Sequence, residues 1–171
     1  MKEEIKRATA VLVEQALWDC TRAADLASFQ FGQRRSVKGY SADTREVGEY
    51  ALHVQCPWRI TQHDLTIVGS GDLYCPPDLW NKEPDLNFDW RPVGANRRDH
   101  LLKVLFEGGA RVFLVQGVEV GNAGSVRIGL EDDYSLEVLP DLSTDDEQWR
   151  LFRPYREHEP HFVVTGKGIE S

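Results

Sequence analysis

Alternating apolar and polar positions predict that most of this chain is β-strand. The clearest case is Val47–Cys56. Its apolar set is Tyr50, Leu52, Val54 and Cys56, and the set between them is Glu49, Ala51, His53 and Gln55. Alternation with a period of two places these sets on opposite faces of a strand. Pro57 lacks the amide that a ladder needs, so we expect pairing to end there.

Six further segments have strand character. They are Ala24–Phe31, Asp64–Val68, Arg111–Val120, Ser125–Leu130, Tyr134–Leu139 and His161–Thr165. Turn residues separate three of them into a meander, at Gly121–Gly124 and at Asp132-Asp133. The alternation predicts a shared core of Leu52, Val54, Val112, Leu114, Val126, Ile128, Leu136 and Val138.

Two segments have helical spacing. Residues 3–18 repeat apolar side chains every three or four positions, which predicts an N-terminal helix. Asp99–Glu107 predicts a second helix, with Asp99 as its N-cap and Gly108-Gly109 as its end. A capping-box pattern, Thr144 with Glu147, predicts a short helical turn before Trp149. Gln33–Lys38 is expected to be a basic loop and Gly166–Ser171 a frayed tail.

These elements together predict an α+β fold. Regular crossover helices do not separate the strand runs, which favours an antiparallel sheet over a parallel one. We therefore expect a predominantly antiparallel β-sheet with an N-terminal helix and one or two short helices packed on it. The 171 residues match the length of a single domain spanning residues 1–171.

Charge changes this picture in one segment. Glu131–Glu147 contains eight acidic residues and no Lys or Arg, in a chain whose net charge is −8. Such a segment repels phosphate, so we expect no nucleic-acid partner, but it attracts a basic protein. The partner-binding candidates are Glu131, Asp132, Asp133, Asp145, Asp146 and Glu147. The alternative is a solvated edge that keeps the protein soluble.

Cysteine usage and hydropathy indicate the compartment. There are only three cysteines, at positions 20, 56 and 75, and an odd, small number argues against a disulfide framework. Free thiols fit a reducing compartment. No signal-peptide core follows the first residues, and no run of eighteen apolar residues occurs. We therefore expect a cytoplasmic protein without a membrane partner; its oligomeric state stays open.

Zinc-ligand residue types occur, but their spacing argues against a metal site. His53 and Cys56 lie three positions apart on a predicted strand, so their side chains diverge. His158 and His161 flank Pro160, which disfavours the helix that metalloprotease motifs use. We expect no metal and no cofactor.

The stretch Pro76–Gly94 is the candidate for a ligand site. It holds four prolines and two tryptophans, Trp80 and Trp90. Long loops without regular structure are uncommon in compact domains and are often functional. A loop tryptophan can anchor a ligand, or it can plug the loop onto the sheet. The ligand-binding candidates are Trp80, Trp90, Asp72 and His53.

Several blocks of the sequence resemble one group of proteins. The blocks are GEYALHVQCPWRI (Gly48–Ile60), VGSGDLYCP (Val68–Pro76), GANRRDHLL (Gly94–Leu102), LEVLPD and EQWRLF (within Leu136–Phe152), and EPHFVVTG (Glu159–Gly166). They are similar to an uncharacterised group of small bacterial cytosolic proteins of unknown function. The resemblance implies a bacterial origin and supplies no catalytic residues.

Three function classes follow. The first is a small interaction protein, immunity-like, that neutralises a basic partner. The second is a small-ligand-binding domain with a pocket between the sheet and the Trp80–Trp90 loop. The third is an enzyme using Asp72, His53, His63 or Asp99 for acid–base work. No nucleophile elbow, Walker A loop or dinucleotide fingerprint occurs, so we assign no catalytic residue.

Overall fold

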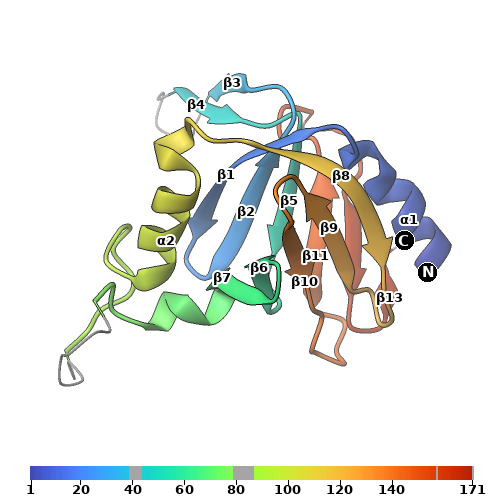
Figure 1. Ribbon diagram of the computed structural model, residues 1–171. Helices are drawn as coiled ribbons and strands as arrows, with labels where there is room; N and C mark the ends of the chain where they lie inside the picture. Colours follow the sequence, from blue (N-terminus) through green and yellow to red (C-terminus); the bar gives the residue numbers. More distant parts are fainter. Residues whose placement is uncertain (39–43, 79–86, 157, 171) are drawn as a thin grey trace.

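The protein is an α+β fold dominated by antiparallel sheet, as predicted (Figure 1). The computed structural model describes residues 1–38, 44–78, 87–156 and 158–170. The helices are α1 (Lys2–Thr9) and α2 (Arg97–Leu105), with 3-10 turns η1 (Ala10–Leu12), η2 (Ser70–Tyr74) and η3 (Glu107–Gly109). The strands are β1 (Ala16–Ala23), β2 (Leu26–Phe31), β3 (Arg35–Lys38), β4 (Thr44–Val47), β5 (Tyr50–Val54), β6 (Trp58–Gln62), β7 (Leu65–Gly69), β8 (Phe113–Val120), β9 (Val126–Leu130), β10 (Tyr134–Val138), β11 (Glu147–Phe152), β12 (Phe162–Thr165) and β13 (Gly168–Ile169).

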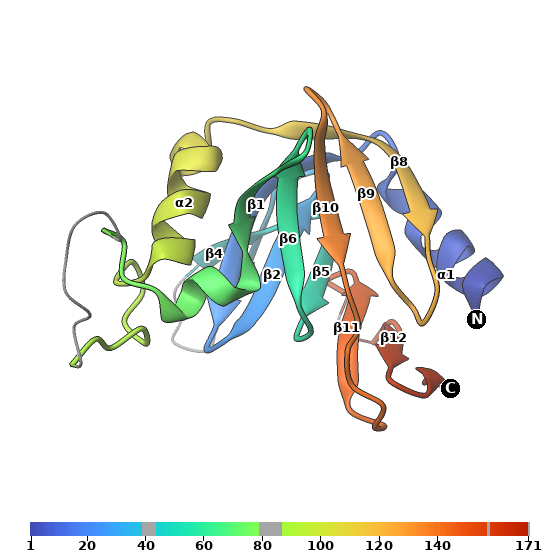
Figure 2. The ribbon, with the colours of Figure 1, turned by 60° about the horizontal axis from the view of Figure 1, so that its bottom comes forward.

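One long sheet folds back over itself. Its eleven strands run in the order β13-β12-β11-β5-β2-β1-β8-β9-β10-β6-β7, and β3 with β4 forms a separate two-stranded sheet. Figure 2 shows β6, β9 and β10 in front of β1, β2 and β5. Phe29 of β2 meets Trp58 of β6 edge to face, with ring centroids 5.0 Å apart. The main core therefore lies between the two halves of the sheet.

The predicted core is confirmed except on β8. Six of the eight expected residues are buried: Leu52, Val54, Val126, Ile128, Leu136 and Val138. Val112 and Leu114 are instead 46% and 39% exposed, whereas Phe113 and Val115 are buried. Every second residue of a strand faces the core. The prediction was wrong by one residue in this apolar run, so it assigned the exposed side chains to the core and the buried ones to the surface.

The N-terminal helix is shorter than predicted. Helix α1 ends at Thr9, η1 continues to Leu12, and Ala16 already belongs to β1. β-Branched Val11 and Val13 disfavour continued helix. The segment after Glu14, which has a φ of 65°, is paired with β2 and β8. Strand pairing therefore overrides the helical spacing.

Helix α2 is confirmed, but its N-cap is Asn96 and not Asp99. The Asn96 side-chain oxygen accepts a hydrogen bond from the Asp99 amide at 2.9 Å. The Asp99 carboxylate in turn accepts a hydrogen bond from Asn96 Nδ2 at 3.0 Å. Asp99 thus sits in the first turn of the helix, where a carboxylate favours the helix dipole.

Other boundaries differ from the prediction. The expected strand Val47–Cys56 is divided, because β4 ends at Val47 and β5 starts at Tyr50. At Gly48, a Cβ atom would lie 2.5 Å from the Phe31 carbonyl oxygen, so only glycine permits this close crossing. Five segments were not predicted as strands and are strands: β1, β6, β11, β3 in the expected basic loop, and β13 in the expected tail. The helical turn expected from Thr144 and Glu147 does not form, because Glu147 is the first residue of β11.

Candidate functional site

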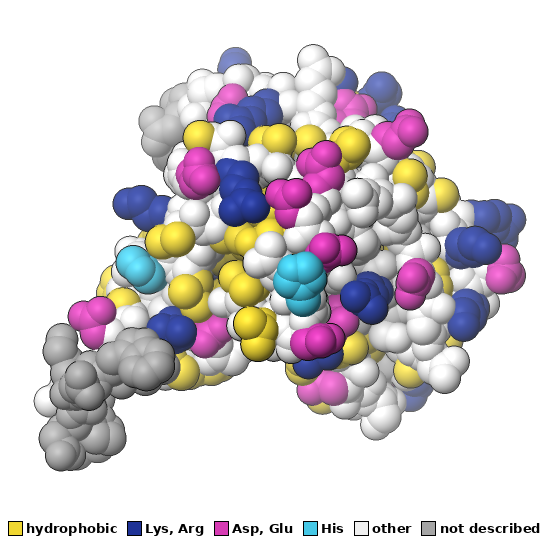
Figure 3. Space-filling model, in the orientation of Figure 1, with side chains coloured by type: hydrophobic (Ala, Val, Ile, Leu, Met, Phe, Trp, Pro, Cys, Tyr) yellow, Lys and Arg dark blue, Asp and Glu magenta, His cyan; other side chains and the backbone are white. Residues whose placement is uncertain are grey.

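The candidate site is a cleft of about 480 Å³ between β1 and α2. It exists because β1 pairs with β8 only at Ala16 and Leu17, after which the two strands separate. Helix α2 packs on β7 and η2. One wall is residues 19–22 of β1, and the other includes Leu102, Lys103 and Phe106. Figure 3 shows hydrophobic side chains gathered on this face beside α2.

Beyond Leu17, none of the strands that the structure describes pairs with the edge of β1 that faces this cleft. The β1–β2 hairpin turns at Ala24-Asp25, with Ala23 opposite Leu26 and Thr21 opposite Ser28. In an antiparallel ladder only alternate residues exchange hydrogen bonds with the neighbour. Thr21 and Ala23 therefore bond to β2, and the backbone groups of Cys20 and Arg22 point into the cleft. The Cys20 amide donates to Asp19 Oδ1 at 2.9 Å.

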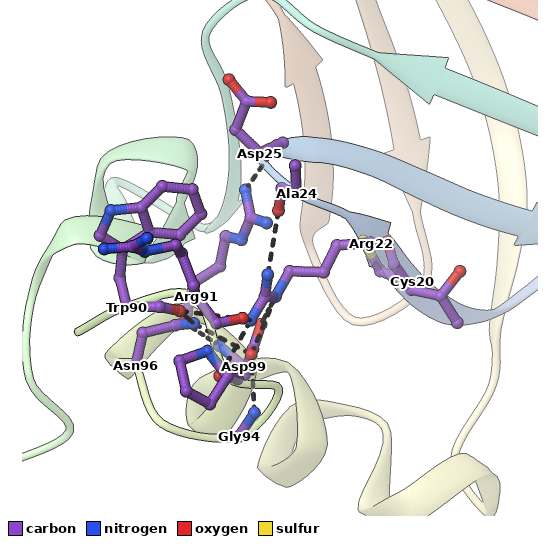
Figure 4. A network of polar contacts seen from close by, with 12 residues as sticks. Cys20, Arg22, Ala24, Asp25, Trp90, Arg91, Gly94, Asn96 and Asp99 are labelled. Atoms are coloured by element: carbon purple, nitrogen blue, oxygen red, sulfur yellow. Dashed lines mark hydrogen bonds and ion pairs between the residues drawn. The ribbon is translucent and has the colours of Figure 1, made fainter.

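Arg22 holds the two walls together (Figure 4). Its Nε lies 3.0 Å from both carboxylate oxygens of Asp99, and the two side chains are only 7% and 12% exposed. Its Nη2 donates to the carbonyls of Trp90, Arg91 and Pro92 at 3.3, 2.9 and 3.0 Å. One guanidinium thus fixes the start of α2 and the preceding loop against β1.

The remaining polar groups give the cleft one acid and one base. Burial raises the pKa of the Asp19 carboxyl, and the hydrogen bond from the Cys20 amide and the charge of Arg34 oppose this shift. Lys103 is exposed and makes no ion pair with any described residue. Burial also raises the pKa of the Cys20 thiol, with the charge of Arg98 opposing it. This thiol is therefore neutral and a poor nucleophile.

The structure does not bring the predicted ligand-binding residues together. Asp72 accepts a hydrogen bond from the Gly69 amide at 2.8 Å and pairs with Arg97 at 3.4 Å. The Trp90 ring packs edge-on against Tyr74, with centroids 5.4 Å apart. Trp80 lies outside the described residues. The loop end after Trp90 does reach the cleft, because Val93 and Gly94 line it.

His53 lies on β5, on the face opposite Leu52 and Val54. Its ring meets Phe152 edge to face at 4.6 Å, and Phe152 stacks on His161 at 4.3 Å. Burial, together with the positive charges of Arg150, His161 and Arg45, lowers the pKa of His53 to about 4. His53 is therefore a neutral packing residue at pH 7.

This lowered pKa predicts a pH-dependent stability. An unfolded histidine takes up its proton near pH 6.5, whereas folded His53 does so near pH 4. The unfolded chain then binds more protons between these values, so unfolding free energy rises from pH 4 to 6.5 and levels off above. We expect His53 to contribute on the order of 2 kcal/mol to this rise. His53→Gln should flatten it in denaturant titrations at several pH values, and an unchanged slope would contradict the assignment.

The acidic segment is divided between the two ends of β10. Asp132 and Asp133 form the β9–β10 turn, while Asp145 and Asp146 lie in the β10–β11 connection. Arginine or lysine side chains pair with four of its members: Arg111–Asp132 3.7 Å, Arg59–Glu137 2.5 Å, Lys167–Asp145 3.1 Å and Arg150–Glu147 2.8 Å. The His63 ring lies 3.6 Å from Asp133. Glu131 accepts from the Leu114 amide at 3.0 Å. Folding thus separates and partly neutralises a segment that is continuous in sequence.

The metal-ligand residue types do not converge. In the described ranges, no group of three or more His, Cys, Asp or Glu side chains is placed to hold a metal ion. All three cysteines are free thiols. Burial raises the pKa of Cys56 to about 12. Cys56 is thus a small core residue, on the face opposite His53.

Sequence reasoning had selected only Asp99 among the polar residues of the cleft. Asp19 and Arg22 were missed because they lay between a predicted helix and a weak strand. No local pattern marks them, since Arg22 and Asp99 are 77 positions apart.

Comparisons with known proteins add no name to this site. No protein-family model matches the chain, and neither the curated proteins nor the solved structures include a significant match. Within the part of the chain that the structure describes, no helix has the length and apolar character needed to cross a membrane.

Proposed function

We propose that this protein is a binding domain whose cleft between β1 and α2 takes an extended peptide segment as an added strand. The carrying observation is the edge of β1 beyond Leu17, with which no described strand pairs and whose Cys20 and Arg22 backbone groups face an open cleft. The Cys20 amide donates to Asp19 Oδ1, so an added strand must replace that one bond. An exposed strand edge is a template for pairing with another chain. Peptide-binding domains use this mode, with main-chain hydrogen bonds for affinity and side-chain pockets for selection.

The dimensions of the cleft support a short segment. Residues 19–22 span about 10 Å at the usual rise per strand residue, which corresponds to three or four peptide residues. The volume of about 480 Å³ lies within the usual range for ligand sites. Leu102 and Phe106 offer an apolar wall, while Asp19 and Lys103 offer opposite charges for selection.

The test uses a displayed library of short peptides and the amide NMR signals of the protein. We expect a selected peptide to move the Cys20 and Arg22 signals more than those of Thr21 and Ala23. N-methylation of alternate peptide amides should weaken binding at least tenfold, with the intervening positions tolerant. Lys103→Glu should change which peptides are selected. The control is Lys6→Glu on α1, which makes the same charge change away from the cleft and should leave the selection unchanged.

The proposal fails if no library member binds. It also fails if a bound peptide leaves the Cys20 and Arg22 amides unmoved, because strand addition requires contact with that edge.

A second candidate is the basic protein partner. Its support is exposure: the side chains of Asp132, Asp133 and Asp145 are 74%, 75% and 80% exposed. Exposed carboxylates speed association with positive surfaces and lose this effect in salt. Changing Asp132, Asp133, Asp145 and Asp146 to lysine should slow binding of a basic partner at low salt, and a thermal melt checks that the variant is folded at the assay temperature. An unchanged association rate with unchanged salt dependence would reduce these residues to a solubilising role.

A further inference from the structure

Asp19 is a partly buried carboxylate on the wall of the cleft that has no ion-pair partner. It lies on β1 and lines the cleft. Its Oδ1 accepts the hydrogen bond from the Cys20 amide at 2.9 Å. Among the residues that the structure describes, none forms an ion pair with Asp19, and none donates a hydrogen bond to its Oδ2. No oxygen of Asp19 is enclosed without a partner, so the free Oδ2 is reachable from solvent.

The neighbouring arginine does not fill this position. The charge of Arg34 favours the ionised Asp19 carboxylate, but burial opposes it more strongly, so the pKa of Asp19 is raised. The Arg34 guanidinium is used elsewhere. It lies 4.5 Å from the centroid of the Trp18 ring, its Nη2 donates to the Gly109 carbonyl at 2.6 Å, and its Nη1 is 3.9 Å from Glu46. A partly desolvated carboxylate in this state is stabilised by a further cation beside it.

The cleft has room for such a cation. Its volume is about 480 Å³, and Leu102 and Phe106 line the wall opposite Asp19. An apolar wall suits the methylene groups of a long cationic side chain, and an aromatic ring attracts a cation over its face. Lys103 on the same wall is exposed, so its ammonium group can turn towards solvent and leave the cleft to the ligand.

We propose that Asp19 selects an ammonium group, so that the cleft binds peptide segments that carry a cation at the position opposite Asp19. The inference rests on the proposed strand addition for its geometry. Residues directly opposite each other in a ladder share one face and lie close enough for opposite charges to pair. The ammonium group has two possible sources in a peptide, a lysine side chain or the amino terminus.

The experiment uses an N-acetylated, C-amidated tetrapeptide of alternating threonine and valine, with lysine at each position in turn. Norleucine in place of lysine keeps the methylene groups and removes the charge. The Cys20 and Arg22 amide signals report strand addition, and the carbon signal of the Asp19 carboxyl group reports the ion pair. At one position, lysine should bind about tenfold more tightly than norleucine and should shift the Asp19 signal. If a norleucine peptide with a free amino terminus shows the same gain, the chain end is the source.

A variant assigns this preference to the carboxylate. Asp19→Asn keeps an oxygen for the Cys20 amide and removes the charge, so lysine and norleucine peptides should bind it about equally. Glu3→Gln on α1 makes the same change from acid to amide away from the cleft and should retain the preference. A preference that persists in Asp19→Asn overturns the inference. If Asp19→Asn does not fold, the wild-type comparison of the two peptides decides alone.

The remaining outcomes separate this inference from strand addition. If lysine and norleucine peptides bind the wild-type protein equally and both move the Cys20 and Arg22 amides, strand addition stands and selection by Asp19 is wrong. If none of the peptides binds, strand addition is wrong, and n-butylammonium titrated at constant ionic strength decides on Asp19. A saturable shift of the carboxyl signal supports selection of an ammonium group, and an unmoved signal overturns it.

Discussion

Replacing Arg22 with alanine is expected to lower the free energy of unfolding by about 3–5 kcal/mol, the usual cost of removing one partner of a buried ion pair. The pair with Asp99 is 7% and 12% exposed, so the remaining carboxylate would lose its charge partner inside the protein. The same change removes the donors to the Trp90, Arg91 and Pro92 carbonyls. Denaturant unfolding of the purified variant measures the loss.

Two matched variants separate the contributions at this position. Arg22→Lys retains a charge beside Asp99 but cannot reach all three carbonyls, so we expect an intermediate loss. Asp99→Ala combined with Arg22→Ala should cost less than the sum of the single changes, because both remove the same pair. Additive losses would mean that the ion pair does not stabilise the fold. A loss below about 1 kcal/mol for Arg22→Ala would show that the cleft walls are held by other contacts.

Phe113→Ala should also cost about 3–5 kcal/mol, whereas its neighbour Leu114→Ala should cost less than about 1 kcal/mol. Phe113 is 2% exposed, and its ring meets Tyr134 and Phe106 at 4.9 and 5.9 Å. Leu114 is 39% exposed on the opposite face of β8. Truncating Phe113 therefore opens a cavity, while truncating Leu114 removes only part of an exposed contact.

Paired chemical-denaturation curves give this comparison directly. The two variants alter adjacent residues of one strand, so any general effect on strand propensity is shared. A larger loss for Leu114→Ala than for Phe113→Ala would reverse the assignment of faces on β8, and with it the position of the core relative to that strand.

The candidate site was only partly accessible from sequence. Asp99 was selected because a carboxylate precedes a helical pattern, and the stretch before Gly94 because its prolines indicate a loop. The long-range contact that builds the cleft joins Arg22 to Asp99 across 77 positions. Alternation and turn chemistry act over a few residues, so they carry no information about such a pair.

The amino-acid sequence by itself determined the antiparallel α+β class and the meander of β8, β9 and β10. Local interactions suffice there, because Asp132 and Asp133 both adopt a positive φ in a tight turn and join strands whose alternation is clear. Only the tertiary structure decided that β1 is a strand, that β6 and β11 enter the long sheet, and which face of β8 is buried. It also decided that β1 and β8 separate after Leu17. The physical reason is that a strand is stabilised by neighbours distant in sequence, so where pairing stops, and what cleft it leaves, depends on the packing of the whole sheet.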